Sequence, residues 1–149
     1  MITYENNLFT LQGEEFTCLL RVNQWNTLEQ LYFGPTVDNA DWMAFQPMPG
    51  IGWGSSVLLE EGNNESCADG MPLAWSGSGR GDYRETPLDV GVSTDFRYES
   101  HRILEEAVMM ESGLPQASGK GECLEITMAQ KGLQLKLYFG VFGGVMTRR

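Results

Sequence analysis

The sequence predicts an all-β protein, an antiparallel β-sandwich, and three observations lead to that expectation. Residues 123–128 and 133–141 alternate apolar and polar side chains, as strands do when they bury one face and leave the other in water. Shorter runs of this kind recur between turns rich in glycine, proline and asparagine. No part of the chain alternates strands with long helical segments, the pattern of a parallel sheet. We therefore expect a single unit of about ten short strands.

The first part of the chain predicts a β-meander. Three short strands are expected, at residues 7–11, 17–22 and 28–33. Gly13 ends the first strand and Gly34-Pro35 ends the third. Asn26 lies in the turn between the second and third strands, where asparagine can adopt a left-handed conformation. This spacing of strands and turns is typical of antiparallel neighbours.

An ordered loop is expected to follow, at residues 36–54. It contains Trp42, Phe45 and Trp53 among closely spaced prolines and glycines, a density that excludes a regular helix or a central strand. So many large apolar side chains cannot remain solvated at low cost. The tryptophans either anchor the loop against the sandwich or stack on sugar rings, and the sequence leaves both interpretations open. Residues 60–70 are expected to form a polar surface loop.

Residues 72–102 hold the densest pattern of polar and glycine residues in the chain. Trp75 and Tyr83 flank a run with glycines at positions 77, 79 and 81, which permit tight backbone turns. Arginines and carboxylates then alternate up to position 102, with short strands expected near residues 88–90 and 96–98 and a turn between them. Two interpretations stay open: a structural turn held by salt bridges, or a contact with a polar ligand or another subunit.

The last part of the chain predicts a β-hairpin. Residues 104–111 have local helix propensity but are too few to hold a helix alone, so we expect a helical turn or an irregular segment. The two alternating strands that follow are joined by residues 129–132, which end in a glycine.

Composition restricts the class of protein. The chain has 149 residues, 42% of them hydrophobic and 11% aromatic, which is typical of one globular domain with a real core. Its formal net charge is −10, which argues against binding to nucleic acid or to an anionic membrane surface. A neutral substrate such as a sugar is compatible with this charge.

The three cysteines are expected to be free thiols. Cys18, Cys67 and Cys123 are odd in number, distant in sequence and not spaced as metal ligands. No signal-peptide pattern is visible at the start of the sequence, and no apolar run is long enough to span a membrane. We therefore expect a cytoplasmic location, with no metal and no cofactor.

The polar segment resembles a known family. Its residues match two conserved runs of the amino-terminal domain of the family 36 glycoside hydrolases, which are mostly α-galactosidases. The matching positions are Pro72, Leu73, Trp75, Ser76, Gly77, Gly79, Arg80, Gly81, Asp82, Tyr83, Arg84 and Pro87, followed by Thr94, Asp95, Phe96, Tyr98, Ser100 and His101. Weaker matches at residues 22–34 and 124–148 extend the resemblance over nearly the whole chain.

The resemblance implies a three-part parent enzyme. Enzymes of this family have a large β-sandwich, followed by a (β/α)8 barrel and then a small carboxy-terminal β-domain. They hydrolyse terminal α-galactosides such as melibiose and raffinose with retention, and both catalytic carboxylates belong to the barrel. Residues 1–149 are then a single, partial amino-terminal β-sandwich domain without the catalytic barrel. No catalytic residue is expected in this chain, which would be inert alone.

The resemblance also implies what such a domain does. In similar enzymes it packs on the barrel, supports oligomers and, in some members, reaches over a neighbouring subunit's substrate pocket. That loop corresponds to residues 36–71, where Asp41 and Trp53 are candidate substrate contacts in trans. The motif residues are expected to be structural: Trp75, Arg80, Asp82, Tyr83, Arg84, Asp95 and His101. His101 and Arg102 are expected to order a turn after the strand that contains Tyr98.

Two alternatives of other classes stay open. Four tryptophans in a β-fold of suitable size are compatible with a free-standing carbohydrate-binding module. A pure assembly domain is the other alternative. An incomplete sandwich exposes strand edges that pair with other chains, so we expect the isolated chain to form oligomers or to aggregate.

Overall fold

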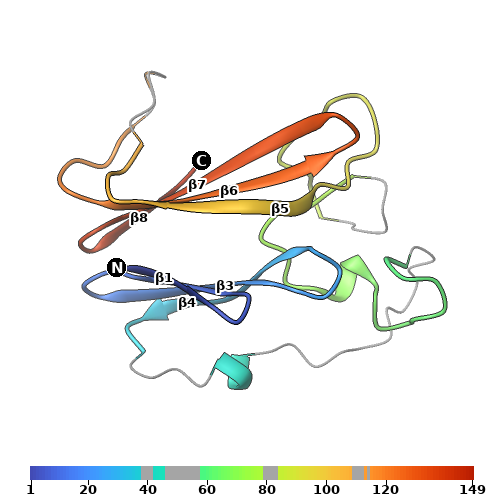
Figure 1. Ribbon diagram of the computed structural model, residues 1–149, viewed down its shortest axis with the longest axis horizontal. Coiled ribbons are helices and arrows are strands. Elements are labelled where there is room, and N and C mark those ends of the chain that lie inside the picture. The colour runs from blue at the N-terminus through green and yellow to red at the C-terminus, as the bar shows by residue number, and fades with distance from the viewer. Residues whose placement is uncertain (38–41, 46–57, 79–83, 109–112, 114) are drawn as a thin grey trace.

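A computed structural model describes residues 1–37, 42–45, 58–78, 84–108, 113 and 115–149. Two four-stranded antiparallel sheets lie face to face, which confirms the predicted β-sandwich (Figure 1). The strand order is β1-β2-β3-β4 in the first sheet and β5-β6-β7-β8 in the second, so every strand pairs with its neighbour in sequence. Within the described residues, no helix is long and apolar enough to cross a membrane.

The first sheet is the predicted meander with one more strand. Its members are β1 (Ile2–Glu5), β2 (Leu8–Gln12), β3 (Phe16–Val22) and β4 (Leu28–Pro35). Asn6 and Asn7, with φ of 51° and 63°, join β1 to β2 in a two-residue turn of the kind that suits the twist of a hairpin. Asn26 has a φ of 56°, which confirms the left-handed turn expected between β3 and β4.

The second sheet contains the predicted hairpin. Its members are β5 (Arg97–Leu104), β6 (Glu122–Gln130), β7 (Leu133–Phe142) and β8 (Val145–Arg148). Gln130 pairs with Leu133, and the turn between them consists of Lys131 and Gly132, with φ of 41° and 83°. The alternation seen in the sequence sets the register, because Leu124, Ile126 and Met128 face the first sheet and are buried.

One strand expected in the middle of the chain is absent, and another is longer than expected. Residues 88–90 form no strand, because Asp89 accepts a hydrogen bond from the amide of Gly91 and bends the chain there. The strand expected near residues 96–98 instead begins at Arg97 and continues to Leu104. Residues 104–111 were expected to form a helical turn or an irregular segment. Leu104 ends β5, residues 105–108 are irregular, and residues 109–111 lie outside the described residues.

The core lies between the two sheets and is almost entirely apolar. Phe9 and Leu11 of β2 and Phe139 of β7 are fully buried there, and Trp75, Leu88, Tyr98 and Met146 pack around its margin. Two short 3-10 helices lie outside the sheets, η1 (Trp42–Phe45) and η2 (Ala68–Gly70). Phe45 of η1 packs on Tyr32 of β4, with ring centroids 4.9 Å apart.

The connecting segments are concentrated at one end of the sandwich. In Figure 1, the β3–β4 turn, the β6–β7 turn and the long segments 58–78 and 84–96 lie at the end opposite the N-terminus. We call this region the loop end and define it as residues 23–27, 58–78, 84–96 and 130–132. It contains most of the described residues of the polar motif.

Candidate functional site

The motif segment enters the loop end as an extra strand beside β4. The amide of Gln30 donates to the carbonyl oxygen of Pro72 at 2.8 Å, and the amide of Ala74 donates to that of Leu28, also at 2.8 Å. Glu29 and Leu73 form an isolated antiparallel bridge between these two contacts. Residues 72–74 therefore extend the first sheet beside β4, and this places Trp75 against the core.

A tight backbone crossing follows, where Gly77-Ser78 passes Thr94. The amide of Thr94 donates to the carbonyl oxygen of Ser78 at 3.0 Å, and the Ser78 amide donates to Thr94 Oγ1 at 2.9 Å. A Cβ at position 77 would collide with the carbonyl oxygen of Thr94, so glycine is required there by close approach. Thr94 is 1% exposed, and this crossing fixes the two halves of the motif against each other.

Gln130 ties the crossing to the β6–β7 turn. Its Nε2 donates to the carbonyl oxygen of Ser93 at 2.8 Å, and its Oε1 accepts a hydrogen bond from the amide of Asp95. Both ends of one side-chain amide are thus used to hold the backbone that leads into β5. Sequence reasoning did not identify Gln130, because a single polar residue at a hairpin turn carries no distinctive pattern.

Two arginines of the polar segment, Arg84 and Arg97, bind backbone carbonyl groups. Arg84 donates from Nη1 to the oxygen of Met71 at 2.7 Å and from Nη2 to that of Ala68 at 2.8 Å. Arg97 donates from Nη1 to the oxygen of Trp25 at 2.8 Å, and its Nη2 lies 2.8 and 2.9 Å from the two oxygens of Asp95. These contacts hold the backbone before and after the motif in place.

A buried ion pair lies under the loop end, on the outer face of the first sheet. The Glu29 carboxylate, 2% exposed, accepts from Arg21 Nε at 2.8 Å and from Nη2 at 2.5 Å, and from Asn23 Nδ2 at 3.0 Å. Asn23 Oδ1 in turn accepts from the amides of Trp25 and Thr27. The sequence signal that could have found it is the opposite charge of Arg21 and Glu29 across a short hairpin.

The described tryptophans of the loop end are held by the protein. Trp25 Nε1 donates to Glu60 Oε2 at 3.1 Å, and hydrogen bonds from Asn63 and Trp25 hold the pKa of Glu60 below its usual value. The Trp75 ring packs against the core cluster. The sequence left anchoring and sugar stacking open for Trp42 and Trp53; their side chains lie outside the described part of the structure.

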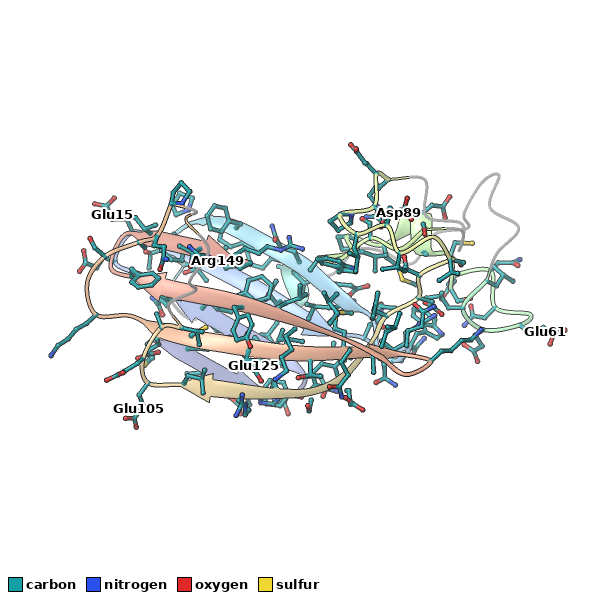
Figure 2. The ribbon with its side chains drawn as sticks, turned by 90° about the horizontal axis from the view of Figure 1, so that it is seen from above. Glu15, Glu61, Asp89, Glu105, Glu125 and Arg149 are labelled. Atoms are coloured by element: carbon teal, nitrogen blue, oxygen red, sulfur yellow. The ribbon has the colours of Figure 1, made fainter. Side chains whose placement is uncertain are left out.

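Several motif residues fall outside the loop end or outside the described residues. His101 and Arg102 were expected in a turn, but both lie within β5, which continues past Tyr98. Glu125 lies on the outer face of the second sheet (Figure 2). It accepts two hydrogen bonds from Arg102, and this contact lowers the pKa of Glu125. Five predicted residues cannot be placed because they are not among the described residues: Asp41, Trp53, Arg80, Asp82 and Tyr83.

The described part of the loop end offers little room for a ligand. A cavity of about 30 Å³ lies between Trp75, Gly77, Thr94 and Asp95, room for about one water molecule and far below the roughly 300 Å³ of a small ligand site. Among the residues that the structure describes, no group of three or more His, Cys, Asp or Glu could hold a metal ion. What these residues can do chemically is fix the backbone of the loop end.

Comparison with known proteins identifies the family. The family model described as "Glycosyl hydrolase family 36 N-terminal domain" matches residues 26–149. The chain belongs to this family. The resemblance of residues 72–102 to this domain is therefore confirmed. Among curated proteins, no sequence matches the chain.

Solved structures of α-galactosidases share the fold of this family 36 domain. The galactosidase domain of the α-galactosidase-sucrose kinase AgaSK superposes with a TM-score of 0.82 and 24% identity, over 99% of this chain and 22% of that chain. The α-galactosidase AgaB from Geobacillus stearothermophilus superposes with a TM-score of 0.78 and 22% identity, over 99% of this chain and 22% of that chain. The α-galactosidase from Lactobacillus brevis superposes with a TM-score of 0.77 and 17% identity, over 95% of this chain and 20% of that chain. The chain thus spans about a fifth of their length.

Proposed function

We propose that this chain is the N-terminal domain of an α-galactosidase and acts together with a catalytic domain. That domain would be the (β/α)8 barrel, which would supply the nucleophile and the acid/base for retaining hydrolysis of terminal α-galactosides such as melibiose and raffinose. Residues 1–149 would form only part of the amino-terminal sandwich and would be inert alone. The observation that carries this proposal is the family match over residues 26–149, together with structural neighbours that are α-galactosidases.

Three described carboxylates, Glu29, Glu60 and Glu125, support a role other than catalysis. A general acid of a retaining glycosidase needs a raised pKa beside a second carboxylate. Hydrogen bonds instead lower the pKa of Glu60 and of Glu125, and Glu29 is paired with Arg21 inside the protein. These three carboxylates hold arginine, asparagine and tryptophan side chains in place.

The proposed contribution of the domain is packing and assembly. It would contact the barrel and support an oligomer, and residues 36–71 would reach the substrate-pocket rim of a neighbouring subunit. Asp41 and Trp53 are the proposed contacts in trans. The hydrogen bonds of the loop end support this proposal, since Arg84 and Arg97 hold the segments that enter and leave the motif.

The first experiment is to read the coding sequence beyond codon 149 and to assay the encoded protein on p-nitrophenyl α-galactoside. We expect an open frame that continues into a barrel with two carboxylates, and activity that the 149-residue chain alone lacks. A stop codon at that point, or hydrolysis by the 149-residue chain, would overturn the proposal.

A galactoside titration of tryptophan fluorescence tests the carbohydrate-binding alternative. Because Trp53 is proposed to contact substrate only at the pocket rim of a complete neighbouring subunit, we expect melibiose and raffinose to leave the emission of the isolated chain unchanged. Saturable quenching would favour a binding module instead. Gel filtration of the same sample tests the expected self-association through strand edges.

A further inference from the structure

A hollow lies at the end of the sandwich opposite the loop end. It measures about 500 Å³ and lies between the segment that follows β5, the segment that leads into β6 and the end of β7. A second hollow of about 640 Å³ adjoins it and shares Glu105, Lys120 and Gly121 in its lining. Figure 2 shows Glu105 at the opposite end of the molecule from Glu61, which belongs to the loop end. Each volume falls within the roughly 300–1,000 Å³ of small-molecule sites.

The ring of Phe142 lies across two glycines on the outer face of the second sheet. Val141 points into the core, so the next side chain, that of Phe142, points to the outer face. A Cβ at Gly121 would meet ring atom Cδ1 at 2.6 Å, and a Cβ at Gly140 would meet ring atom Cε2 at 2.7 Å. These two atoms are opposite each other in the ring, so the ring covers both glycines. A larger side chain at either position would displace it.

The exposed side of this ring is an apolar surface. Phe142 lines the 500 Å³ hollow with the part of its ring that the glycines do not cover. Val145 pairs with Phe142 across the ladder and is 53% exposed, so it widens the apolar surface on the same face. A flat aromatic ring that is held against the backbone and open on one side can stack on a ligand ring.

Charged side chains stand around this surface. Glu105, Glu106 and Lys120 line the same hollow and are exposed. In the described part of the structure, no hydrogen bond or ion pair engages these three side chains. The two carboxylates can therefore accept hydrogen bonds from a ligand, and the ammonium group can donate them.

This combination of groups suits a neutral saccharide. The C–H face of a pyranose ring can cover the aromatic ring, while its hydroxyl groups bind the charged groups at the margin. The two hollows are lined by one lysine and by four glutamates, at positions 14, 105, 106 and 122, and this charge disfavours an anionic ligand. No group of His, Cys, Asp and Glu among the described residues could hold a metal ion, so these carboxylates do not indicate a metal site.

We propose that Phe142, Glu105, Glu106 and Lys120 form a binding site for a neutral saccharide, with the Phe142 ring as the stacking surface. The site goes beyond the function proposed above, because it needs no catalytic domain and performs no hydrolysis. It also differs from the sugar-stacking hypothesis drawn from the sequence, which concerned Trp42 and Trp53. A phenylalanine beside two glycines gave no such signal in the sequence.

Amide NMR of the ¹⁵N-labelled 149-residue chain tests the site, with raffinose as one neutral probe and maltotriose as a second that contains no galactose. We expect saturable shifts of the amide signals of Gly119, Lys120, Gly121 and Phe142 with at least one probe at concentrations up to about 10 mM. No shifts with either probe, or shifts only elsewhere in the chain, would overturn the proposal. The failure of this site is thus recognised separately from the failure of the proposed function, which is read from the coding sequence and the hydrolysis assay.

A matched pair of phenylalanine variants tests the stacking. Phe142→Leu keeps an apolar side chain but removes the flat ring, so binding should weaken by roughly two- to tenfold, the range expected for an aromatic contact. Phe33→Leu is the control, since Phe33 is 55% exposed and lines neither hollow, and the affinity should stay unchanged. Equal affinity of Phe142→Leu and the unsubstituted chain, with an amide spectrum that shows a retained fold, would overturn the stacking surface.

A charge variant and a charged probe test the polar margin without disturbing the core. Lys120 is exposed, so Lys120→Gln should fold even if Phe142→Leu does not. The amide makes weaker hydrogen bonds to hydroxyl groups than the ammonium does, and binding of the neutral probe should weaken severalfold. Trigalacturonate should cause no shifts, because the glutamates repel it. Unchanged affinity in Lys120→Gln, or binding of trigalacturonate as tight as that of raffinose, would overturn the assigned polar contacts.

Discussion

Arg97 Nη1 donates to the carbonyl oxygen of Trp25 at 2.8 Å and so joins the two sheets at the loop end. Arg97 begins β5 in the second sheet, whereas Trp25 lies in the β3–β4 turn of the first. The amide of Tyr98 donates to the carbonyl oxygen of Asn26 at 2.8 Å, one residue further along on each side. The Asp95 carboxylate orients the Arg97 guanidinium, so this charged pair of the motif holds the two sheets together at the loop end.

Replacing Arg97 with glutamine should remove this hydrogen bond between the sheets and destabilise the fold. The Trp25 carbonyl and the Asp95 carboxylate lose their donor, and we expect a loss of about 1–3 kcal/mol in the free energy of unfolding, since Arg97 is only 25% exposed. Urea unfolding followed by tryptophan fluorescence measures it. Lys120→Gln is the control, because the Lys120 side chain is exposed and its loss should be smaller. Equal losses in the two variants would contradict the assignment.

Removing Arg21 should be more damaging than removing any exposed cation. Arg21→Gln leaves the Glu29 carboxylate, 2% exposed, with only the amide of Asn23 as donor, and such a broken pair costs about 3–5 kcal/mol. The double variant Arg21→Met with Glu29→Leu removes both charges and should recover most of the loss, as measured by urea unfolding. If the double variant is as unstable as Arg21→Gln, the ion pair is not the cause.

The alternating strands were predictable because their signal is local. In β6 and β7 the side-chain period of two reveals the buried face, and the glycine at position 132 indicates the turn. β1 and β8 have four residues each and too little alternation to be recognised. The segment 88–90 has the alternation of a strand, but the Asp89 to Gly91 turn prevails over it.

The contacts of the loop end could not be predicted in the same way. Arg84 and Arg97 donate to backbone carbonyl oxygens of residues distant in sequence. Every residue has a carbonyl oxygen, so the amino-acid types do not show which one an arginine will bind. The resemblance of the motif to a family predicts that Arg84 and Asp95 are structural, and it does not specify which groups they contact. It misplaced His101, because a strand that continues past a bulge near Tyr98 looks like a strand that ends there.

The close backbone crossing at Gly77 predicts that alanine is far more destabilising at position 77 than at position 70. Gly77→Ala places a methyl group against the carbonyl oxygen of Thr94, a backbone atom that cannot move away cheaply. We expect a loss of about 1–3 kcal/mol on urea unfolding, the usual range for overpacking. Gly70→Ala is the control, since nothing lies within 4 Å of its Cβ position and its φ is not positive. A stable Gly77→Ala protein would show that the crossing can relax.

The thiols should react only when the chain unfolds. Cys18, Cys67 and Cys123 are free and buried, and burial raises the pKa of Cys18 to about 12. Because the thiolate is the reactive form, Cys18 has almost none of it near neutral pH and no access to reagent. Its labelling by an aromatic disulfide should therefore rise with urea in parallel with the loss of tryptophan signal. To resolve this site, Cys67 and Cys123 are replaced by alanine. Labelling of Cys18 that is fast without urea would show local opening of β3 instead, since β3 is the strand that places Cys18 in the core.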